Sequence, residues 1–384
     1  MKNLHPKVNV LLRFSGVKIV VTFTLNFALY LLVGCSTTQT ETNLHQLTTP
    51  DHLISKNKTE ISVMSFNVEN LFDAQHDPQR EDYTFLPLSQ KNTPEVQKYC
   101  LSQSSKWRQA ECLETDWNEN VVKTKLKQIA KVLRHIDNGQ GPDNLMLIEV
   151  ENLSILNRLV KEELNELGYQ TVVLLEGPDT RGIDPGFISK LPLIGSPKLH
   201  IIPYHDTDPE QLKWAQKSRG LLEVTVKTPL NTELTFLIGH FPSQNNPVSW
   251  RKQAVQYATH LISEYEKNGR AVIFGGDLNI SKEEEKNEKF FSQDFSRIGQ
   301  VSHLVGCQSC LGTHNFKGSW SFLDALIYSN TLNKSGYQLI PESIQVVKTA
   351  HHTKANGAPK SFRLENLEGV SDHFPLYSRL KSLK

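Results

Sequence analysis

A series of short apolar segments constrains the fold of this chain more than any other feature. Each segment is about as long as a β-strand, is bounded by turn residues and is largely apolar throughout, which is typical of strands buried on both faces. From Ile61 onward they are "ISVMSFNV", "NLMLIEV", "TVVLLE", "GLLEVTV", "ELTFLIGHF", "AVIFGG" and "FLDALIYS". The segments predict β-sheets that are covered on both sides.

Helical patterns occur between only some of these strands. Apolar residues keep one helical face over residues 122–136 and 153–167, and a third helix is expected over about 250–267. Strands with so few helices between them predict an α/β fold in which two sheets pack together with helices outside. The long polar segments 73–118 and 281–320 are expected to be surface insertions around a cleft.

The N-terminal segment differs from the rest of the chain. Residues 1–34 carry four basic residues, no acidic one and a terminal apolar run, so we expect a lipoprotein signal peptide that ends before a lipidated Cys35. An uncleaved anchor helix is the alternative. Residues 35–59 are polar and predict a flexible tether to a domain over 60–384. The chain is thus expected to be an exported, membrane-anchored lipoprotein of a bacterial cell envelope, and Ser36 favours the outer membrane.

Charge and cysteine content set further limits. Removal of residues 1–34 would change the formal charge from +1 to −3, which argues against a protein that coats polyanions through a broad positive field. Four cysteines remain after Cys35, and an exported protein would use them in two disulfides. We favour the sequence-local pairs among three connectivities, namely Cys100 with Cys112 and Cys307 with Cys310. Half of a zinc site or a redox pair at Cys307 and Cys310 is less favoured.

Polar and ionisable residues follow, interrupt or, as with Asp372 and His373, directly precede many of the predicted strands. Such groups are costly to bury unless they are paired or hold a cation. Asn and Glu oxygens suit a hard cation such as Mg²⁺, Mn²⁺ or Ca²⁺, while separate Asp and His residues suit base and acid work on a phosphate ester. The combination predicts metal-assisted hydrolysis. The residues concerned are Asn67, Glu69, Glu149, Glu151, His240, Asp277, Asn279, Asp324, Asp372 and His373.

The motifs around these residues resemble, in order, those of the endonuclease/exonuclease/phosphatase superfamily, which has the deoxyribonuclease I-like fold. They cover roughly residues 61–380. The resemblance implies a four-layered α/β sandwich of two packed mixed sheets with outer helices, whose strand ends form one cleft. The motifs are "SFNVENLFD", "LIEVEN", "DTRGID", "GHFPSQ", "GGDLN", "GTHNFKGSWSFLDALIYS" and "SDHFPL".

The resemblance also implies roles for individual residues. Asn67 and Glu149 match metal-binding positions, and Asp372 stands where the family often has an acid near the metal. Asp277 matches the acid that orients or deprotonates the attacking water, and Asn279 matches the amide that holds the phosphate or that water. The glycines of "GGDLN" are expected to give backbone and phosphate room to approach closely.

The remaining roles concern histidines and arginines. His373 matches the histidine that contacts the scissile phosphate, Asp324 its carboxylate partner, and His240 a second phosphate-binding histidine. Arg181 and Arg251 could each be a phosphate contact or an ordinary ion pair, and we favour contact for Arg181.

Structural explanations compete at several of these positions. Asn67 could cap a strand end, Glu149 and Glu151 could be the acidic first turn of a helix, and Asn279 could help cap the helix after it. For Asp277, Glu149 and His373 we favour the functional interpretation, because one catalytic arrangement predicts all three together.

The sequence therefore predicts a divalent-metal-dependent hydrolase of phosphate esters, and most specifically a membrane-anchored nuclease that cleaves phosphodiester bonds of nucleic acid. No protein partner is implied. The alternatives are a sphingomyelinase-like or phosphoinositide-like phosphatase or phospholipase acting on membrane lipids, a small phosphodiester hydrolase, and a catalytically inactive binding lipoprotein.

Overall fold

The structure, a computed structural model, describes residues 56, 57 and 59–383, all within the compact unit His45–Lys384. The predicted signal peptide, Cys35 and nearly all of the tether lie outside the described residues. None of the helices within the described ranges is long and apolar enough to cross a membrane.

The first sheet is mixed and has six strands in the order β13-β14-β1-β2-β4-β3. Only β1 and β2 run parallel; the other neighbours are antiparallel. The strands are β1 (Glu60–Leu71), β2 (Asn144–Val150), β3 (Thr171–Leu174), β4 (Asp184–Ser189), β13 (Tyr337–Val346) and β14 (Leu376–Ser382).

The second six-stranded sheet has the order β5-β6-β7-β8-β12-β9, and again a single pair, β7 and β8, is parallel. A separate two-stranded ribbon joins β10 and β11. The strands are β5 (Leu193–His200), β6 (Leu221–Lys227), β7 (Glu233–His240), β8 (Val272–Asp277), β9 (Gly299–Val301), β10 (His314–Phe316), β11 (Ser319–Ser321) and β12 (Asp324–Ser329).

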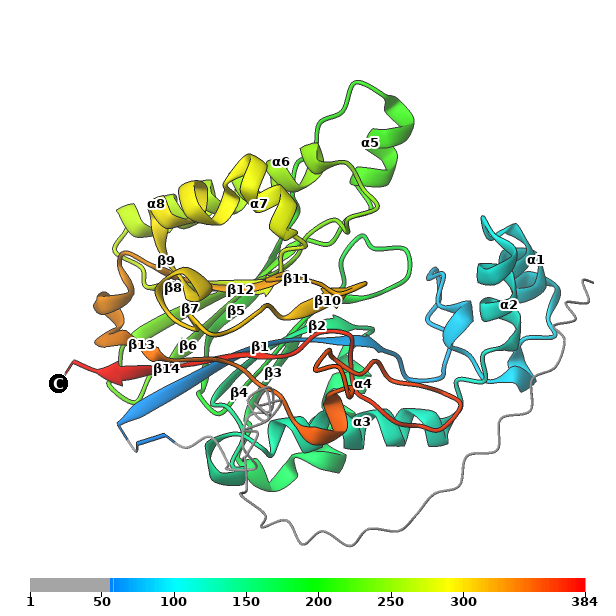
Figure 1. The fold of residues 1–384 in the computed structure, drawn as a ribbon, viewed down its shortest axis with the longest axis horizontal. Helices are drawn as coiled ribbons and strands as arrows, with labels where there is room; N and C mark the ends of the chain where they lie inside the picture. The colour runs from blue at the N-terminus through cyan, green and yellow to red at the C-terminus, as the bar shows by residue number, and fades with distance from the viewer. Residues whose placement is uncertain (1–55, 58, 384) are drawn as a thin grey trace, which may run out of the picture. The chain divides into compact units, whose positions relative to one another are not determined.

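The two sheets pack face to face, and helices cover both outer faces (Figure 1). Phe187 of the first sheet contacts Phe236 of the second, with ring centroids 4.9 Å apart. Along β1, Val63 faces the space between the sheets, whereas Met64 and Phe66 face the helices. Burial on both faces explains why the strands are apolar throughout rather than alternating. The predicted four-layered α/β sandwich is confirmed.

Two groups of helices form the outer layers. α3 and α4 pack on the first sheet, and α6 packs on the second. The Asn118 side chain accepts hydrogen bonds at the start of α3, and apolar residues at helical spacing bury one face of that helix. The helices are α1 (Pro94–Ser102), α2 (Lys106–Glu114), α3 (Glu119–Leu133), α4 (Leu153–Arg158), α5 (Pro209–Ala215), α6 (Val248–Lys267), α7 (Lys282–Glu288), α8 (Ser296–Ile298) and α9 (Ser302–Val305).

The two long polar segments both contain regular structure, and only the first has a core of its own. Residues 73–118 contain α1 and α2 and have a small core of Tyr83, Leu86, Val96, Cys100 and Cys112. We call this segment the insertion. Residues 281–320 are not the surface insertion that the sequence predicts, because they contribute β9 to the second sheet and bury Phe290, Phe291 and Phe295 in its core. Their polar part contains α7 and most of the β10-β11 ribbon.

Candidate active site

The central strands of both sheets end at the same cluster of polar side chains. Asn67 lies near the end of β1 and Glu149 near the end of β2, while His240 and Asp277 are the last residues of β7 and β8. These are the two parallel pairs, so each pair brings its carboxyl ends to one edge. Ligands characteristically bind at such edges.

Antiparallel neighbours deliver two further residues to this edge. β12 begins with Asp324, which pairs in register with Asp277 at the end of β8. His373 lies just before β14, whose first residue Leu376 pairs with Ser65 of β1. An antiparallel strand starts where its neighbour ends, and residues far apart in the sequence therefore meet.

The Asn67 amide joins the two carboxylates of the cluster. Its Nδ2 donates to Asp277 Oδ2 at 3.0 Å and to Glu149 Oε1 at 3.3 Å. Asp277 Oδ1 accepts from the backbone N–H of Asn279 at 2.9 Å, and the Asn279 side chain donates to the Phe241 carbonyl. Asp277 is buried, so each of its oxygens is fixed in one direction.

Two histidines face the same oxygen of Asp277. His240 Nε2 lies 3.7 Å and His373 Nε2 lies 3.8 Å from Asp277 Oδ2. The other ring nitrogen of His373, Nδ1, bonds to Asp324 Oδ2 at 2.7 Å. Asp324 thereby fixes the ring orientation and leaves Nε2 directed toward Asp277.

The surroundings shift the pKa values of the two histidines in opposite directions. Burial lowers the pKa of His240 well below its ordinary value, and the Arg219 and Arg181 charges lower it further. Burial also disfavours the charged form of His373, but Asp324, Asp277 and Asp372 outweigh it and raise its pKa well above the ordinary value. At neutral pH His240 is therefore neutral and His373 is a cation.

Burial raises the pKa of the Asp277 carboxyl to about 7. The His373 charge opposes this rise, while the Asp324 charge adds to it. A carboxyl group with a pKa near the operating pH is suited to act as a general base.

A bulge in β1 shapes the metal-binding half of the cluster. Asn67 pairs with Ile148 and Leu71 with Val150, so three residues of β1 oppose Glu149 alone. Glu69 (φ 54°) and Glu149 (φ 68°) adopt left-handed backbone conformations, which are unfavourable for glutamate and concentrate at functional sites.

Glu149 and Asn67 fit a hard divalent cation. The Glu149 side chain is 17% exposed, whereas that of Asp277 is only 3% exposed, so Glu149 is the carboxylate of this pair more open to solvent. The Asn67 atom next to its Oε1 is the donor Nδ2, so the oxygen that a cation would use is Asn67 Oδ1, which accepts from the Glu69 N–H at 3.0 Å. One carboxylate and one amide leave room for water and substrate oxygens, as magnesium sites usually do.

Asp372 lies on the His373 side of the cluster. Its Oδ1 is 3.9 Å from His373 Nε2 and its Oδ2 is 4.0 Å from His314 Nε2. These three residues form a group that could hold a metal ion, and Asp277, Asp324 and His373 form another. The metal role of Asp372 remains a prediction.

His314 and Lys125 belong to the site without a role predicted from the sequence. The His314 ring lies 4.8 Å from that of His373, and the two residues form an isolated β-bridge. Lys125 is fully buried and donates to the Glu69 and Val370 carbonyls at 2.7 and 2.8 Å. A lysine on the apolar face of α3 is a signal that could have identified Lys125. Nothing in the sequence pairs His314 with His373.

The glycines of "GGDLN" serve the fold rather than a phosphate. Gly276 has φ +137°, and a Cβ there would lie 1.9 Å from the Gly239 carbonyl oxygen. A Cβ on Gly275 would meet Leu326 and Met146 between the sheets. We expected the glycines to let a phosphate approach the backbone. In the structure they let β7 approach β8 and let the two sheets pack closely.

Arg181 and Arg251, for which the sequence allows either phosphate contact or an ordinary ion pair, have different surroundings. Arg251 is buried, donates to the carbonyls of Pro242 and Ser243, and pairs with Glu284, so its role is structural. Arg181 is exposed at 44% of its side chain and lies close enough to lower the His240 pKa. The position of Arg181 is compatible with substrate contact, which remains a prediction.

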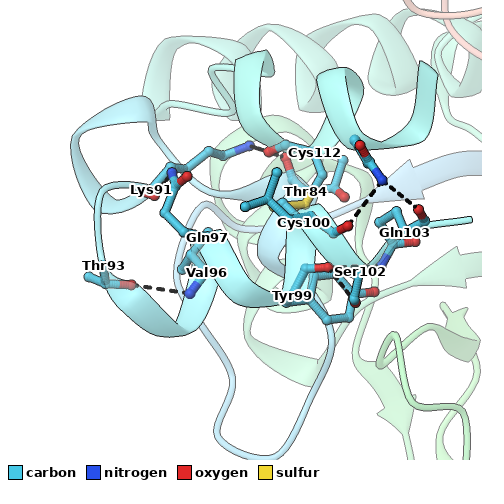
Figure 2. The surroundings of a disulfide bond; sticks show 12 residues. Thr84, Lys91, Thr93, Val96, Gln97, Tyr99, Cys100, Ser102, Gln103 and Cys112 are labelled. Atoms are coloured by element: carbon cyan, nitrogen blue, oxygen red, sulfur yellow. Dashed lines mark hydrogen bonds between the residues drawn. A yellow bond between two sulfur atoms is a disulfide. The ribbon is translucent and has the colours of Figure 1, made fainter. Parts of the chain in front are cut away.

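The disulfides in the structure are Cys100–Cys112 and Cys307–Cys310. These are the sequence-local pairs that we favoured, and they leave no free thiol at Cys307 or Cys310 for zinc. Figure 2 shows the first bond within the insertion, beside buried Lys91, which donates to the Thr84 and Cys112 carbonyls.

A model of the Endonuclease/Exonuclease/phosphatase family matches residues 110–382, well over half of the chain. The chain belongs to this family. It is accordingly a metal-dependent phosphoesterase, and the matched range includes every site residue above except those of β1. No curated protein matches the chain.

Solved structures agree with this fold. D. rerio TDP2, humanized by 14 mutations, is 14% identical over 84% of this chain and 100% of that chain, with a TM-score of 0.52. The mannosyl-6-phosphatase Bt3783 of Bacteroides thetaiotaomicron VPI-5482 is 15% identical over 83% of this chain and 99% of that chain, with a TM-score of 0.50. At these identities the likeness extends to the fold alone.

Proposed function

We propose that the protein is an exported, membrane-anchored nuclease that hydrolyses phosphodiester bonds with a divalent cation. One observation carries the proposal: a single buried carboxylate, Asp277, lies between the Asn67 amide and two histidines, of which His240 is neutral and His373 is a cation. This arrangement can activate water and neutralise a phosphate in the same place.

Asp277 is the proposed general base. Its Oδ2 faces the cleft residues Asn67, His240 and His373, while its Oδ1 is held by the Asn279 backbone. A water molecule at Oδ2 would lose its proton to the carboxylate as its oxygen attacks phosphorus. The bond from phosphorus to the leaving oxygen then breaks, and that oxygen leaves with the electron pair of the bond and takes a proton from water.

His373 is the proposed positive charge for the phosphate. Negative charge on the nonbridging oxygens has to be balanced, and the Nε2 proton of an imidazolium does so at short range. Asp324 holds His373 in this charged form through Nδ1. Neutral His240 can donate or accept a hydrogen bond without adding a second cation.

The proposed cation is Mg²⁺, Mn²⁺ or Ca²⁺, held by Glu149 and Asn67. When bound, such an ion supplies Lewis-acid stabilisation of charge on the phosphate oxygens. The proposal extends to Asp372 as an acid near the ion.

The proposed location depends on the sequence alone. The basic and then apolar residues 1–34, followed by Cys35, support export and lipid attachment. Labelling of the chain with a radioactive fatty acid in cells, and loss of the label in the variant Cys35→Ala, would test it. An unlabelled wild-type chain would contradict the lipid anchor.

A substrate panel tests the proposed reaction. The full chain in detergent is incubated with plasmid DNA, RNA, a chromogenic phosphodiester, mannose 6-phosphate and mixed micelles of phospholipid, each with Mg²⁺, Mn²⁺, Ca²⁺ or chelator. We expect metal-dependent cleavage of the nucleic acids and the diester. Cleavage of only lipid or only the sugar phosphate would contradict the nuclease assignment.

A further inference from the structure

A groove of about 600 Å³ lies beside the cluster of polar side chains at the strand ends. We call that cluster the catalytic cluster; it consists of Asn67, Glu149, His240, Asp277, Asp324 and His373. The insertion and the α5 segment both contribute to its lining, and so does Pro242, two residues beyond His240. Arg181 and Arg219 also line it, and their charges reach His240. The groove thus lies next to His240, although none of the catalytic residues lines it.

Hydrogen bonds attach the insertion to residues 177–180, of which Asp179 and Thr180 line this groove. Arg80 donates to the Gly177 and Asp179 carbonyls at 3.1 and 2.8 Å, and the Glu81 backbone N–H donates to the Thr180 carbonyl at 2.6 Å. Asp179 in turn forms an ion pair with Arg219 at 2.8 Å. The start of the insertion thus contacts the backbone of Asp179, the residue whose carboxylate pairs with Arg219.

The insertion is also rigid within itself. The Cys100–Cys112 disulfide joins α1 to α2, and the Gln109 side chain donates to the Leu101 and Gln103 carbonyls at 3.0 Å each. Tyr99, which lines the groove, stands next to this disulfide (Figure 2). Because of these bonds the insertion keeps its position without a ligand. Its side of the groove is therefore preorganised, which lowers the entropic cost of binding.

The charged residues of the groove suit an anionic ligand. Four basic side chains line it, namely Arg108, Arg181, Lys217 and Arg219, against two acidic ones, Glu81 and Asp179. Asp179 is already paired with Arg219. The whole chain has a formal charge of only +1, so basic residues are concentrated here.

Aromatic side chains stand among these cations. Trp214 at the end of α5 is 60% exposed, and Lys217 Nζ lies 4.7 Å from its ring centroid. Tyr99 of the insertion is partly buried and also lines the groove. Exposed aromatic rings between cations are the combination that binds the bases and phosphates of single-stranded nucleic acid.

A second hollow beside α2 would repel such a ligand. This cavity of about 990 Å³ is lined by Glu111, Glu114, Asp116 and Glu365 against a single basic residue, Arg363. α2 therefore presents Arg108 to one hollow and Glu111 and Glu114 to the other. A polyanion at the catalytic cluster is directed to the Arg108 side.

We propose that this groove is the binding site for a single strand of nucleic acid that extends from the scissile phosphate between the insertion and α5. The phosphates contact Arg108, Arg181 and Lys217, and bases stack on Trp214 and Tyr99. The proposal deepens the nuclease function and rests on it for its role in catalysis, but binding itself can be measured without cleavage.

The test measures binding to an inactive chain. The full chain carrying Asp277→Asn is titrated with a fluorescent single-stranded DNA 12-mer by anisotropy at several salt concentrations. We expect Trp214→Ala in this background to weaken binding about 10-fold. We expect Arg108→Gln with Lys217→Gln to weaken it as well, and to reduce the slope of log K against log salt by about 1.4, the value for two lost phosphate contacts.

The matched control also removes two positive charges, one from the insertion and one from the α5 segment. Lys98 lies on α1 and Lys213 on α5, and neither lines the groove. Lys98→Gln with Lys213→Gln should leave affinity and salt slope unchanged. Equal losses in the control and the groove variant would overturn the proposal, and so would no loss in either.

Two further probes separate the ligand classes and the two proposals. If the groove variant loses binding to inositol trisphosphate, a soluble lipid headgroup, but keeps its affinity for DNA, the nucleic-acid assignment is wrong. If the wild-type chain hydrolyses no diester while the groove variant still loses DNA binding, the proposed catalysis fails and the groove proposal stands.

Discussion

The Asp277 carboxylate owes its proposed role to its surroundings. The same residue on the surface would be a weak base, because an ordinary aspartate has a pKa near 3.9. Burial at the end of β8 raises this pKa to about 7, and hydrogen bonds from Asn67 and Asn279 fix both oxygens. A carboxylate of this kind is both basic enough and well enough oriented to accept a proton from water.

The pH dependence of the reaction should therefore have an acid limb near pH 7. Below that pH Asp277 becomes protonated and can no longer accept a proton, so kcat/KM should fall about tenfold per pH unit. His373, whose pKa lies well above its ordinary value, stays charged over this range. A profile of kcat/KM from pH 5 to 9 checks this, and constant activity down to pH 5 would contradict it.

Replacement of Asp324 by Asn should move the whole pH profile to lower values. The Asp324 charge raises the pKa of His373 and also that of Asp277, so its loss lowers both. The base would work at lower pH, while His373 would lose its proton nearer to neutrality. We expect kcat at pH 8 to fall about 10-fold to 100-fold, with partial recovery near pH 6. An equal loss at every pH would indicate a merely structural defect.

Several site residues could be predicted from the sequence, because motif order and strand-end positions both mark them. Asp277 and Glu149 lie at the end of an apolar run and His373 lies directly before one, and the structure brings the three to one edge. The bulge that turns Glu69 and Glu149 into left-handed conformations could not be predicted, since it depends on the register of β1 against β2. The contact of His314 with His373 likewise depends on packing between distant segments.

At the scale of elements, the site depends on how closely β7 approaches β8. Gly276 makes this approach possible, because any Cβ there would collide with the Gly239 carbonyl. Asp277 and His240 pair in register at the end of the same two strands. Separation of the strands would therefore move both residues.

Gly276→Ala should lower the free energy of unfolding by about 3 kcal/mol or more, because backbone strain and a steric clash add together. Gly269→Ala is the matched control. Gly269 has a positive φ of 69° but no atom within 4 Å of the added Cβ, so we expect a loss of only about 1 kcal/mol. Chemical denaturation compares the two. Equal losses would show that the clash at Gly239 has no effect.

The two disulfides should differ in what they stabilise. Cys100–Cys112 closes a sequence separation of 12 residues within the insertion, and Cys307–Cys310 a separation of three. Loss of the first should cost about 3 kcal/mol in local stability and the second less. Limited proteolysis should therefore cut the insertion sooner in Cys100→Ser with Cys112→Ser than in Cys307→Ser with Cys310→Ser. The opposite order would contradict a stapled insertion.

The fold class could also be predicted at this scale, since continuous apolar runs indicate strands covered on both sides. The internal structure of the insertion could not. Its residues are polar and lack the pattern of a buried helix, and α1 and α2 are held by a disulfide, by Lys91 and by a small separate core. Such contacts have no periodic signature.

At the scale of the whole molecule, both sheets are organised in the same way. Each has one parallel pair, β1 with β2 and β7 with β8, and the carboxyl ends of both pairs form the catalytic cluster. One sheet supplies the predicted metal-binding residues Asn67 and Glu149, and the other supplies Asp277 and His240. The reaction therefore requires the two sheets to be packed together, and unfolding of either should abolish it.

The most direct test of the central claim is the rate of hydrolysis of bis(p-nitrophenyl) phosphate at pH 8 by three chains, the wild type, Asp277→Asn and Asp294→Asn. Asp294 lies in the outer helical layer, away from the catalytic cluster. We predict metal-dependent hydrolysis by the wild type and by Asp294→Asn, none with chelator, and a rate at least about 1000-fold lower for Asp277→Asn. Hydrolysis by Asp277→Asn at the wild-type rate would rule out Asp277 as the base, and hydrolysis undiminished by chelator would rule out a metal-dependent reaction.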